Sequence, residues 1–186
     1  MMRRVSSTCR FFAAAKQGVA AVEFALILPL LVVMLLATFD GGRAIAAYMK
    51  MRAATYALAS ITNQYSTIQS VDMTAILGAT SVVMAPYSSG TPGVVISQIK
   101  INNNGVSKIE WSAAQNATAR TVNSTISPPS SMVVNGSYLI LAEVSYTYVP
   151  VFGFFGTSSG ITFSDSLYVT PRSVSCVAYV PQSSTC

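Results

Sequence analysis

The stretch Gln17-Gly-Val-Ala-Ala-Val-Glu-Phe24 runs directly into an apolar segment that ends at Phe39. From Val19 to Phe39 there are 21 residues, and Glu23 is the one charged side chain among them. A helix of that length reaches about 31 Å, which is close to the thickness of the hydrocarbon core of a bilayer. The sequence therefore predicts a membrane-spanning helix over residues 19–40, with one carboxylate near its start.

The segment before this span is basic. Its four charged side chains are all positive, as is typical of a cytoplasmic flank: Arg3, Arg4, Arg10 and Lys16. Without residues 1–18, the formal charge of +5 falls to +1, because seven cations then face six acids. Most of the net positive charge lies in residues 1–18, so the sequence predicts no nucleic-acid-binding surface in the rest of the chain.

The arrangement resembles the processing signal of type IV pilins, and most closely that of the TadE/TadF-like pseudopilins of tight-adherence (Flp-type) pili. In that family a short basic leader ends in glycine, matched here by Gly18, and a prepilin peptidase cuts after it. The fifth mature residue is glutamate followed by an aromatic residue, matched by Glu23 and Phe24. The resemblance implies that residues 1–18 are a cleaved leader and that Val19 is the first mature residue. It also implies that Glu23 and Phe24 act in processing and assembly.

The resemblance further implies a minor pilin-like subunit that inserts its helix among pilin helices and displays a head domain. Its location would be the bacterial inner membrane, with the N-terminus cytoplasmic before processing and the head periplasmic. The implied partners are the major Flp-type pilin, sister pseudopilins, the prepilin peptidase, the inner-membrane assembly platform and membrane lipid.

Two alternatives remain open at the level of sequence. Glu23 could merely mark the membrane edge, although the 16 residues of Phe24–Phe39 are slightly short for a span. The chain could also carry a Sec signal peptide cut after Ala46, which would give a secreted or anchored adhesin-like binding domain without pilus partners. Glu23 within the apolar region and Arg43 just before that site count against it. The N-terminal residue of the mature protein separates these interpretations.

Composition disfavours an enzyme. Histidine is absent, which removes the commonest general base and the commonest metal ligand. Three cysteines and six acids show no spacing typical of a metal cluster or a catalytic centre. We expect no catalytic residue, no metal and no cofactor.

The cysteines agree with an exported head. Cys9 lies in the leader, whereas Cys176 and Cys186 lie near the far end of the chain. Cleavage after Gly18 would leave an even count, which suits a disulfide in an oxidising periplasm. The sequence predicts a Cys176–Cys186 bond, with two unpaired thiols as the alternative.

Beyond Asp40 the sequence predicts an amphipathic stalk helix over residues 41–63, continuous with the span. Its expected apolar face recurs at steps of mostly three and four residues: Ile45, Tyr48, Met49, Ala53, Tyr56 and Ile61. A break at Gly41-Gly42 is the alternative, since glycine weakens a helix.

Residues 64–186 are predicted to form a small periplasmic α+β head with a short helix and an antiparallel sheet. The helix would start after a cap at Ser70 or Asp72 and stop at Pro86. The expected strands cover residues 94–101, 106–111, 138–148, 161–168 and 173–180. Asn102–Gly105 is a hairpin signal, and residues 113–129 read as a polar loop.

Overall fold

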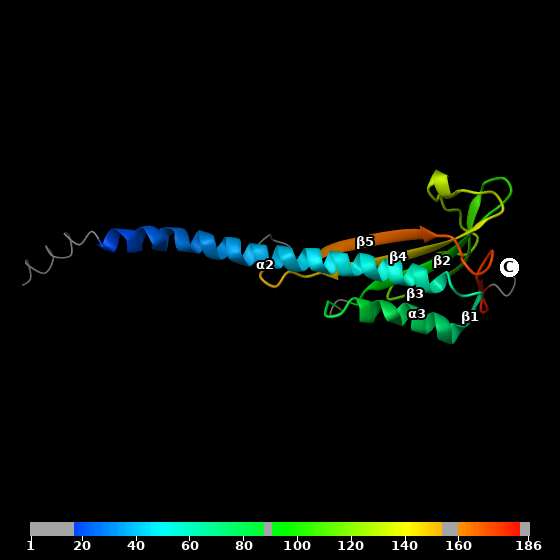
Figure 1. Ribbon diagram of the computed structural model, residues 1–186, viewed down its shortest axis with the longest axis horizontal. Helices are drawn as coiled ribbons and strands as arrows, with labels where there is room; N and C mark the ends of the chain where they lie inside the picture. The colour runs from blue at the N-terminus through cyan, green and yellow to red at the C-terminus, as the bar shows by residue number, and fades with distance from the viewer. Residues whose placement is uncertain (1–16, 88–90, 154–159, 183–186) are drawn as a thin grey trace, which may run out of the picture.

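The structure, a computed structural model, describes residues 17–87, 91–153 and 160–182. It is an α+β fold, as predicted: one long helix precedes a small domain with a second helix and an antiparallel sheet (Figure 1). Its elements in chain order are α2 (Gln17–Thr62), β1 (Thr67–Ile68), α3 (Ser70–Val83), β2 (Gly93–Ile101), β3 (Ser107–Gln115), the 3-10 helix η1 (Ser130–Met132), β4 (Tyr138–Tyr148), β5 (Ile161–Val169) and β6 (Ala178–Tyr179).

Helix α2 is a single element of 46 residues. It contains Pro29 and passes through Gly41 and Gly42 without ending, so the long element predicted from sequence is confirmed and the break is not present. The N-terminal half of α2 projects beyond the head, and the C-terminal half lies along it (Figure 1). Because the helix is uninterrupted, it fixes the head relative to the projecting half.

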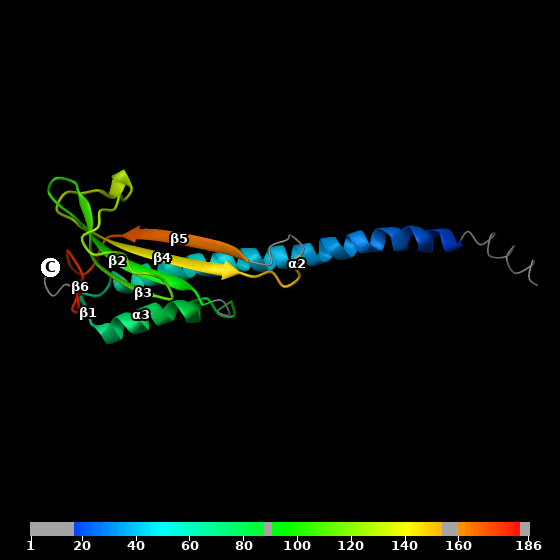
Figure 2. The same cartoon turned by 180° about the vertical axis from the view of Figure 1, so that it is seen from behind.

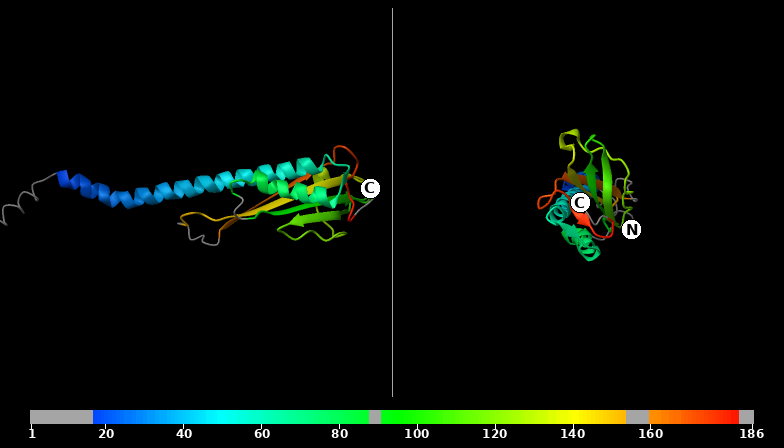
Figure 3. Two further views of the ribbon diagram at one scale, coloured as in Figure 1. Left: turned by 90° about the horizontal axis from the view of Figure 1, so that it is seen from below. Right: turned by 90° about the vertical axis from the view of Figure 1, so that its right-hand side faces the viewer.

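The sheet has the strand order β3-β2-β4-β5, and all its neighbours are antiparallel. Helix α2 contacts β4 and β5, whereas α3 contacts β2 and β3. Both helices therefore cover one face of the sheet, and Figure 2 shows the sheet in front of α2 from the opposite side. The end-on view in Figure 3 shows the two layers.

Strand β4 has the bounds and faces that its alternation predicts. Ile140, Ala142 and Val144 are buried in the core against the helices. Glu143 lies on the opposite face, where the neighbouring Leu139 and Leu141 are also buried, in a second cluster with Ile99 and Ile109. The centre of the sheet thus carries apolar contacts on both faces.

A bulge in β3 places Trp111 and Ile109 on opposite faces of the sheet, and therefore in different clusters. The register of β2 against β3 shifts between Gln98 and Ile99, because Gln98 pairs with Trp111 while Ile99 pairs with Ile109. The extra residue turns Trp111 towards the helices and Ile109 towards the opposite face. The indole Nε1 of Trp111 then donates to the backbone oxygen of Val177 at 2.8 Å, which ties the C-terminal segment to the core.

The apolar face predicted for the stalk is wrong. Ile45, Met49 and Tyr56 are each more than 60% exposed. The buried face of α2 consists largely of small side chains, and it comprises Asp40, Ala47, Met51, Ala54, Thr55, Leu58, Ala59 and Thr62. Small side chains let the helix approach the sheet closely, so the larger ones are left on the outer side.

Two further predictions need correction. The N-cap of α3 is Gln69 rather than Ser70 or Asp72, and the Asp72 carboxylate accepts the backbone N–H of Gln69 at 3.1 Å instead. Residues 173–180 do not form a strand of the sheet: β6 covers two residues and pairs in parallel with β1. β1 lies in the segment 63–70, which the sequence showed only as a polar connection.

Candidate membrane-anchoring and assembly site

The N-terminal half of α2 is an apolar surface that the head leaves uncovered. Every residue from Gly18 to Leu35 is exposed, including Leu26 at 75% and Leu35 at 68%. In the described part of the chain, α2 alone is long and apolar enough to cross a membrane. Exposed apolar surface of this extent requires an apolar surrounding.

The residues predicted for processing and assembly lie together at the start of this surface. Gly18, Val19, Glu23 and Phe24 all belong to the first two turns of α2 and are exposed. Glu23 lies one turn after Val19, on the same part of the helix. Their roles in cleavage and assembly stay predictions.

Gly18 has no steric reason to be glycine. A Cβ atom placed there would meet nothing within 4 Å, and the residue lies in a helix. Packing of the fold therefore does not account for this residue.

Asp40 joins the projecting helix to the head. Its side chain is buried, and its carboxylate oxygens accept the backbone N–H groups of Val151 at 3.1 Å and Phe152 at 3.0 Å. The hydroxyl of Tyr148 donates to the Asp40 backbone oxygen at 3.3 Å. The segment that follows β4 is thus held on α2 at the point where the apolar run ends.

Aromatic contacts surround this junction. The rings of Phe39 and Phe152 meet edge to face with their centroids 6.0 Å apart, and the Arg43 guanidinium lies 5.6 Å from the centroid of the Phe39 ring. Burial, and to a smaller extent the nearby Asp40 charge, raises the pKa of Tyr148 above its ordinary value. The phenol of Tyr148 is therefore held in its neutral form.

Sequence reasoning missed the role of Asp40. It treated this residue as the end of the span, because the partner groups are backbone amides more than 110 positions away. One signal was available: a charged side chain next to a span is costly unless it has a partner. That rule indicates a partner without identifying it.

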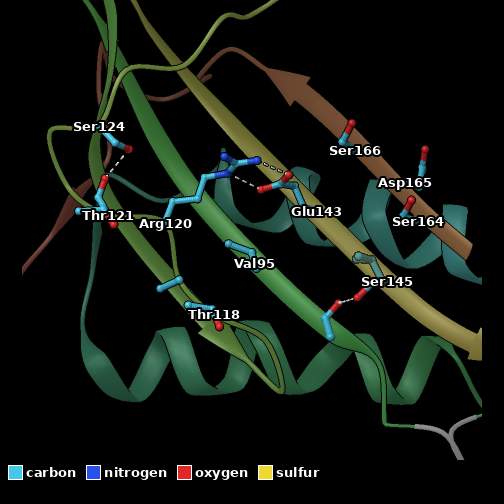
Figure 4. A pocket seen from close by; sticks show the side chains of 13 residues that line it. Val95, Thr118, Arg120, Thr121, Ser124, Glu143, Ser145, Ser164, Asp165 and Ser166 are labelled. Atoms are coloured by element: carbon cyan, nitrogen blue, oxygen red, sulfur yellow. Dashed lines mark hydrogen bonds and ion pairs between the residues drawn. The ribbon is translucent and has the colours of Figure 1, made fainter. Parts of the chain in front are cut away.

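The outer face of the sheet has a polar depression of about 690 Å³ (Figure 4). Across it the Arg120 guanidinium donates two hydrogen bonds to the Glu143 carboxylate, at 2.7 and 2.6 Å, and this bonding raises the pKa of Arg120. The guanidinium of Arg120 and the carboxylate of Glu143 therefore neutralise each other within the depression. Among the described residues, no three His, Cys, Asp or Glu side chains gather in a way that could hold a metal ion.

Cys176 is buried and disulfide-bonded. The chain has two other cysteines, Cys9 and Cys186, and both lie outside the described residues. Pairing with Cys186 stays a prediction.

A helix that could cross a membrane once, joined without a break to a packed α+β head, is the layout expected of a single-pass membrane protein. Residues 18–60 match the family model described as TadE-like protein. The resemblance noted in the sequence is thereby confirmed for this segment, which begins at Gly18 and ends within the stalk, and it associates the chain with tight-adherence pili. No curated protein and no solved structure matches the chain, so the description of the head rests on its own geometry.

Proposed function

We propose that this chain is a minor pilin-like (pseudopilin) structural and assembly subunit of a Flp-type tight-adherence pilus. The projecting half of α2 inserts among the helices of the major pilin and sister pseudopilins, and the head lies in the periplasm. The observation that carries the proposal is the TadE-like match itself, which begins at Gly18 on an exposed apolar helix containing Glu23.

Glu23 supports an assembly role through its energetics. A charged side chain at the centre of a span costs about 2.5–3.5 kcal/mol on insertion scales. A helix N-terminus stabilises a nearby carboxylate by roughly 0.3–1 kcal/mol when exposed, which is too little to offset that cost. Glu23 lies near the start of the span, where the cost is smaller than at the centre, and an ionic partner would offset what remains. We propose the Val19 amine of an adjacent pilin or pseudopilin helix as that partner.

Gly18 supports processing. Because neither packing nor backbone conformation requires glycine there, recognition by a prepilin peptidase is the simplest reason for it. Cleavage between Gly18 and Val19 would create the free amine that Glu23 needs in a neighbouring subunit.

The exposed side of the stalk continues the apolar surface of the projecting half of α2 along the head. Ile45, Met49 and Tyr56 recur at helical spacing on the exposed side of α2, and each is more than 60% exposed. We propose that neighbouring subunits pack against this face.

The geometry disfavours a Sec-secreted binding domain. Cleavage after Ala46 would remove Asp40, whose carboxylate accepts two backbone N–H groups of the head, and Ala44, which packs on the core. The head would then lose these hydrogen bonds and this packing contact. We also propose that the chain is not an enzyme, in keeping with its lack of histidine.

A Glu23→Gln variant tests the proposal, because it keeps the shape of the side chain and removes its charge. We expect this variant to insert and to be largely processed, yet to support no pili and to give no crosslinks to the major pilin. Glu110→Gln makes the same chemical change on β3 and should behave as wild type. Wild-type levels of pili and crosslinks in Glu23→Gln cells would contradict the proposed role.

A further inference from the structure

The contact between Asp40 and the segment after β4 fixes the depth of one part of the head. The proposed span of 21 residues ends at Phe39, immediately before Asp40. Since α2 is uninterrupted, the residues that bind Asp40 lie at the level where the apolar run ends. In Figures 1 and 3 this segment extends from the sheet along α2 towards its N-terminal half.

The same segment exposes apolar side chains at that level. Val149 is 59% exposed, Val151 57% and Phe152 44%, and Phe39 beside them is 50% exposed. Contiguous apolar side chains on the surface of a folded domain indicate a contact with lipid or protein. Here they adjoin the apolar surface of the span through the ring contact between Phe39 and Phe152.

The polar groups at this level suit a membrane interface. The Asp40 carboxylate accepts two backbone N–H groups. The carboxylate and both amides therefore keep hydrogen-bond partners in the interfacial layer, where less water is available than in bulk solution. Arg43 is one turn further from the span, and its side chain stacks on Phe39 while its residue remains exposed. An arginine at this distance beyond a span is placed at the level of lipid headgroups.

We propose that Val149, Val151 and Phe152 form a membrane-contact loop, which inserts into the interfacial layer of the bilayer that α2 crosses. The loop is a second lipid contact beside the helix, and it sets how closely the head approaches the membrane. This inference rests on the proposed membrane span. A lipid surface fits the loop better than another protein, because the loop shares its depth and its apolar character with the end of the span.

Tryptophan fluorescence of the full chain in lipid vesicles tests this inference. The chain has a single tryptophan, and Trp111 is fully buried in the head, so it provides a constant background. Val151→Trp places a reporter on the loop, and Leu26→Trp places one on the exposed part of the span. Val134→Trp is the matched control, because Val134 is 61% exposed and lies two residues after η1. The yellow-green segment of η1 lies at the end of the head remote from the projecting half of α2 (Figure 1).

The probes are vesicles of phosphatidylcholine and phosphatidylglycerol with bromine on the acyl chains, either near the headgroup or near the chain end. We expect the emission of Val151→Trp to be blue-shifted relative to Val134→Trp and to be quenched by bromine near the headgroup, which should leave wild type and Val134→Trp unquenched. Leu26→Trp should be quenched by deep bromine. Adding Asp40→Ala to Val151→Trp should reduce the quenching, because the loop is no longer held on α2.

The outcomes separate this inference from the proposed function. Quenching of Leu26→Trp together with an unquenched Val151→Trp would overturn the membrane-contact loop and leave the span in place. A blue-shifted but unquenched Val151→Trp would assign the loop to a protein neighbour and also overturn the inference. Absence of quenching in Leu26→Trp would contradict the span itself.

Discussion

Asp40 and Phe152 are 112 positions apart in the chain, yet the carboxylate of Asp40 accepts the backbone N–H of Phe152 at 3.0 Å. The Asp40 side chain is 4% exposed, and its second oxygen accepts the N–H of Val151. These bonds link the residue at which the apolar run of α2 ends to the segment after β4. They make the position of the head depend on a side chain of the long helix.

Asp40→Ala should destabilise the head. Without the carboxylate, two backbone N–H groups lose their acceptor, and each such loss costs about 1–3 kcal/mol where water cannot replace it. Pulse proteolysis of the full chain in detergent micelles measures the free energy of unfolding, and hydrogen exchange of the Val151 and Phe152 amides should accelerate. Asp165→Ala removes a carboxylate from β5 and should change the free energy by less than about 0.5 kcal/mol. Equal effects of both substitutions would contradict the role given to Asp40.

Two adjacent alanines test which face of α2 is buried. Ala54 is 0% exposed against the sheet, whereas its neighbour Ala53 is exposed. Ala54→Leu should lower the free energy of unfolding by about 1–3 kcal/mol, because the packed interface has no room for the added atoms. Ala53→Leu makes the same change on the outer face and should leave that free energy nearly unchanged. If Ala53→Leu were the more damaging substitution, the assignment of faces would be reversed.

This pair also shows where sequence patterns succeed and fail. In β4, apolar residues at every second position from Tyr138 to Tyr148 identify the strand and its helix-facing side. The second buried face, formed by Leu139 and Leu141, does not follow from that alternation, because polar residues occupy the rest of that face. In the stalk, large side chains such as Met49 and Tyr56 suggested the buried face. The real contact uses small residues such as Ala54 and Ala59, which hydropathy ranks weakly although they permit close packing.

Contacts between distant segments were beyond sequence reasoning for a different reason. β6 pairs with β1 over two residues, a length too short to produce a periodic pattern. The bonds from Val151 and Phe152 to Asp40 involve backbone amides, which every residue except proline carries. By contrast, the TadE-like segment was identified in advance because its signal is local: a glycine, a glutamate and an aromatic residue at fixed spacing before an apolar run.

Raising the pH should weaken the head through Tyr148. Burial raises the pKa of this phenol above 10.0, so the folded chain keeps a proton that the unfolded chain releases. The stabilising contribution is therefore complete below about pH 10 and is lost as the pH rises through the higher folded pKa. Tyr168, whose pKa burial also raises, adds an effect of the same sign.

Comparison with Tyr148→Phe isolates this effect. Pulse proteolysis from about pH 8 to pH 11 should show a decline in the free energy of unfolding that is shallower in the variant than in wild type. The variant should also be less stable at neutral pH, because it lacks the hydrogen bond to the Asp40 backbone oxygen. Identical slopes in the two proteins would exclude Tyr148 as the titrating group.

Cys176 should resist alkylation in the mature protein unless a reductant is present, because it is disulfide-bonded. We expect its partner to be Cys186, which would close a loop of 11 residues. Such a closure stabilises a fold by roughly 2.5–3 kcal/mol in the chain-entropy model. Mass spectrometry of a non-reduced digest should detect a peptide pair joining these two cysteines. Two alkylated thiols in the native, non-reduced protein would rule the bond out.

The most direct test of the pseudopilin account is the N-terminal residue of the protein extracted from membranes. We expect the intact mass to show the loss of residues 1–18, which leaves Val19 as the first residue, and a Gly18→Leu variant to remain uncut. Gly78→Leu is a suitable control, because Gly78 is also a helical glycine whose added Cβ would meet nothing within 4 Å, and it should be processed normally. A protein that begins at Met1 or Ala47, or a Gly18→Leu variant still trimmed to Val19, would contradict the account.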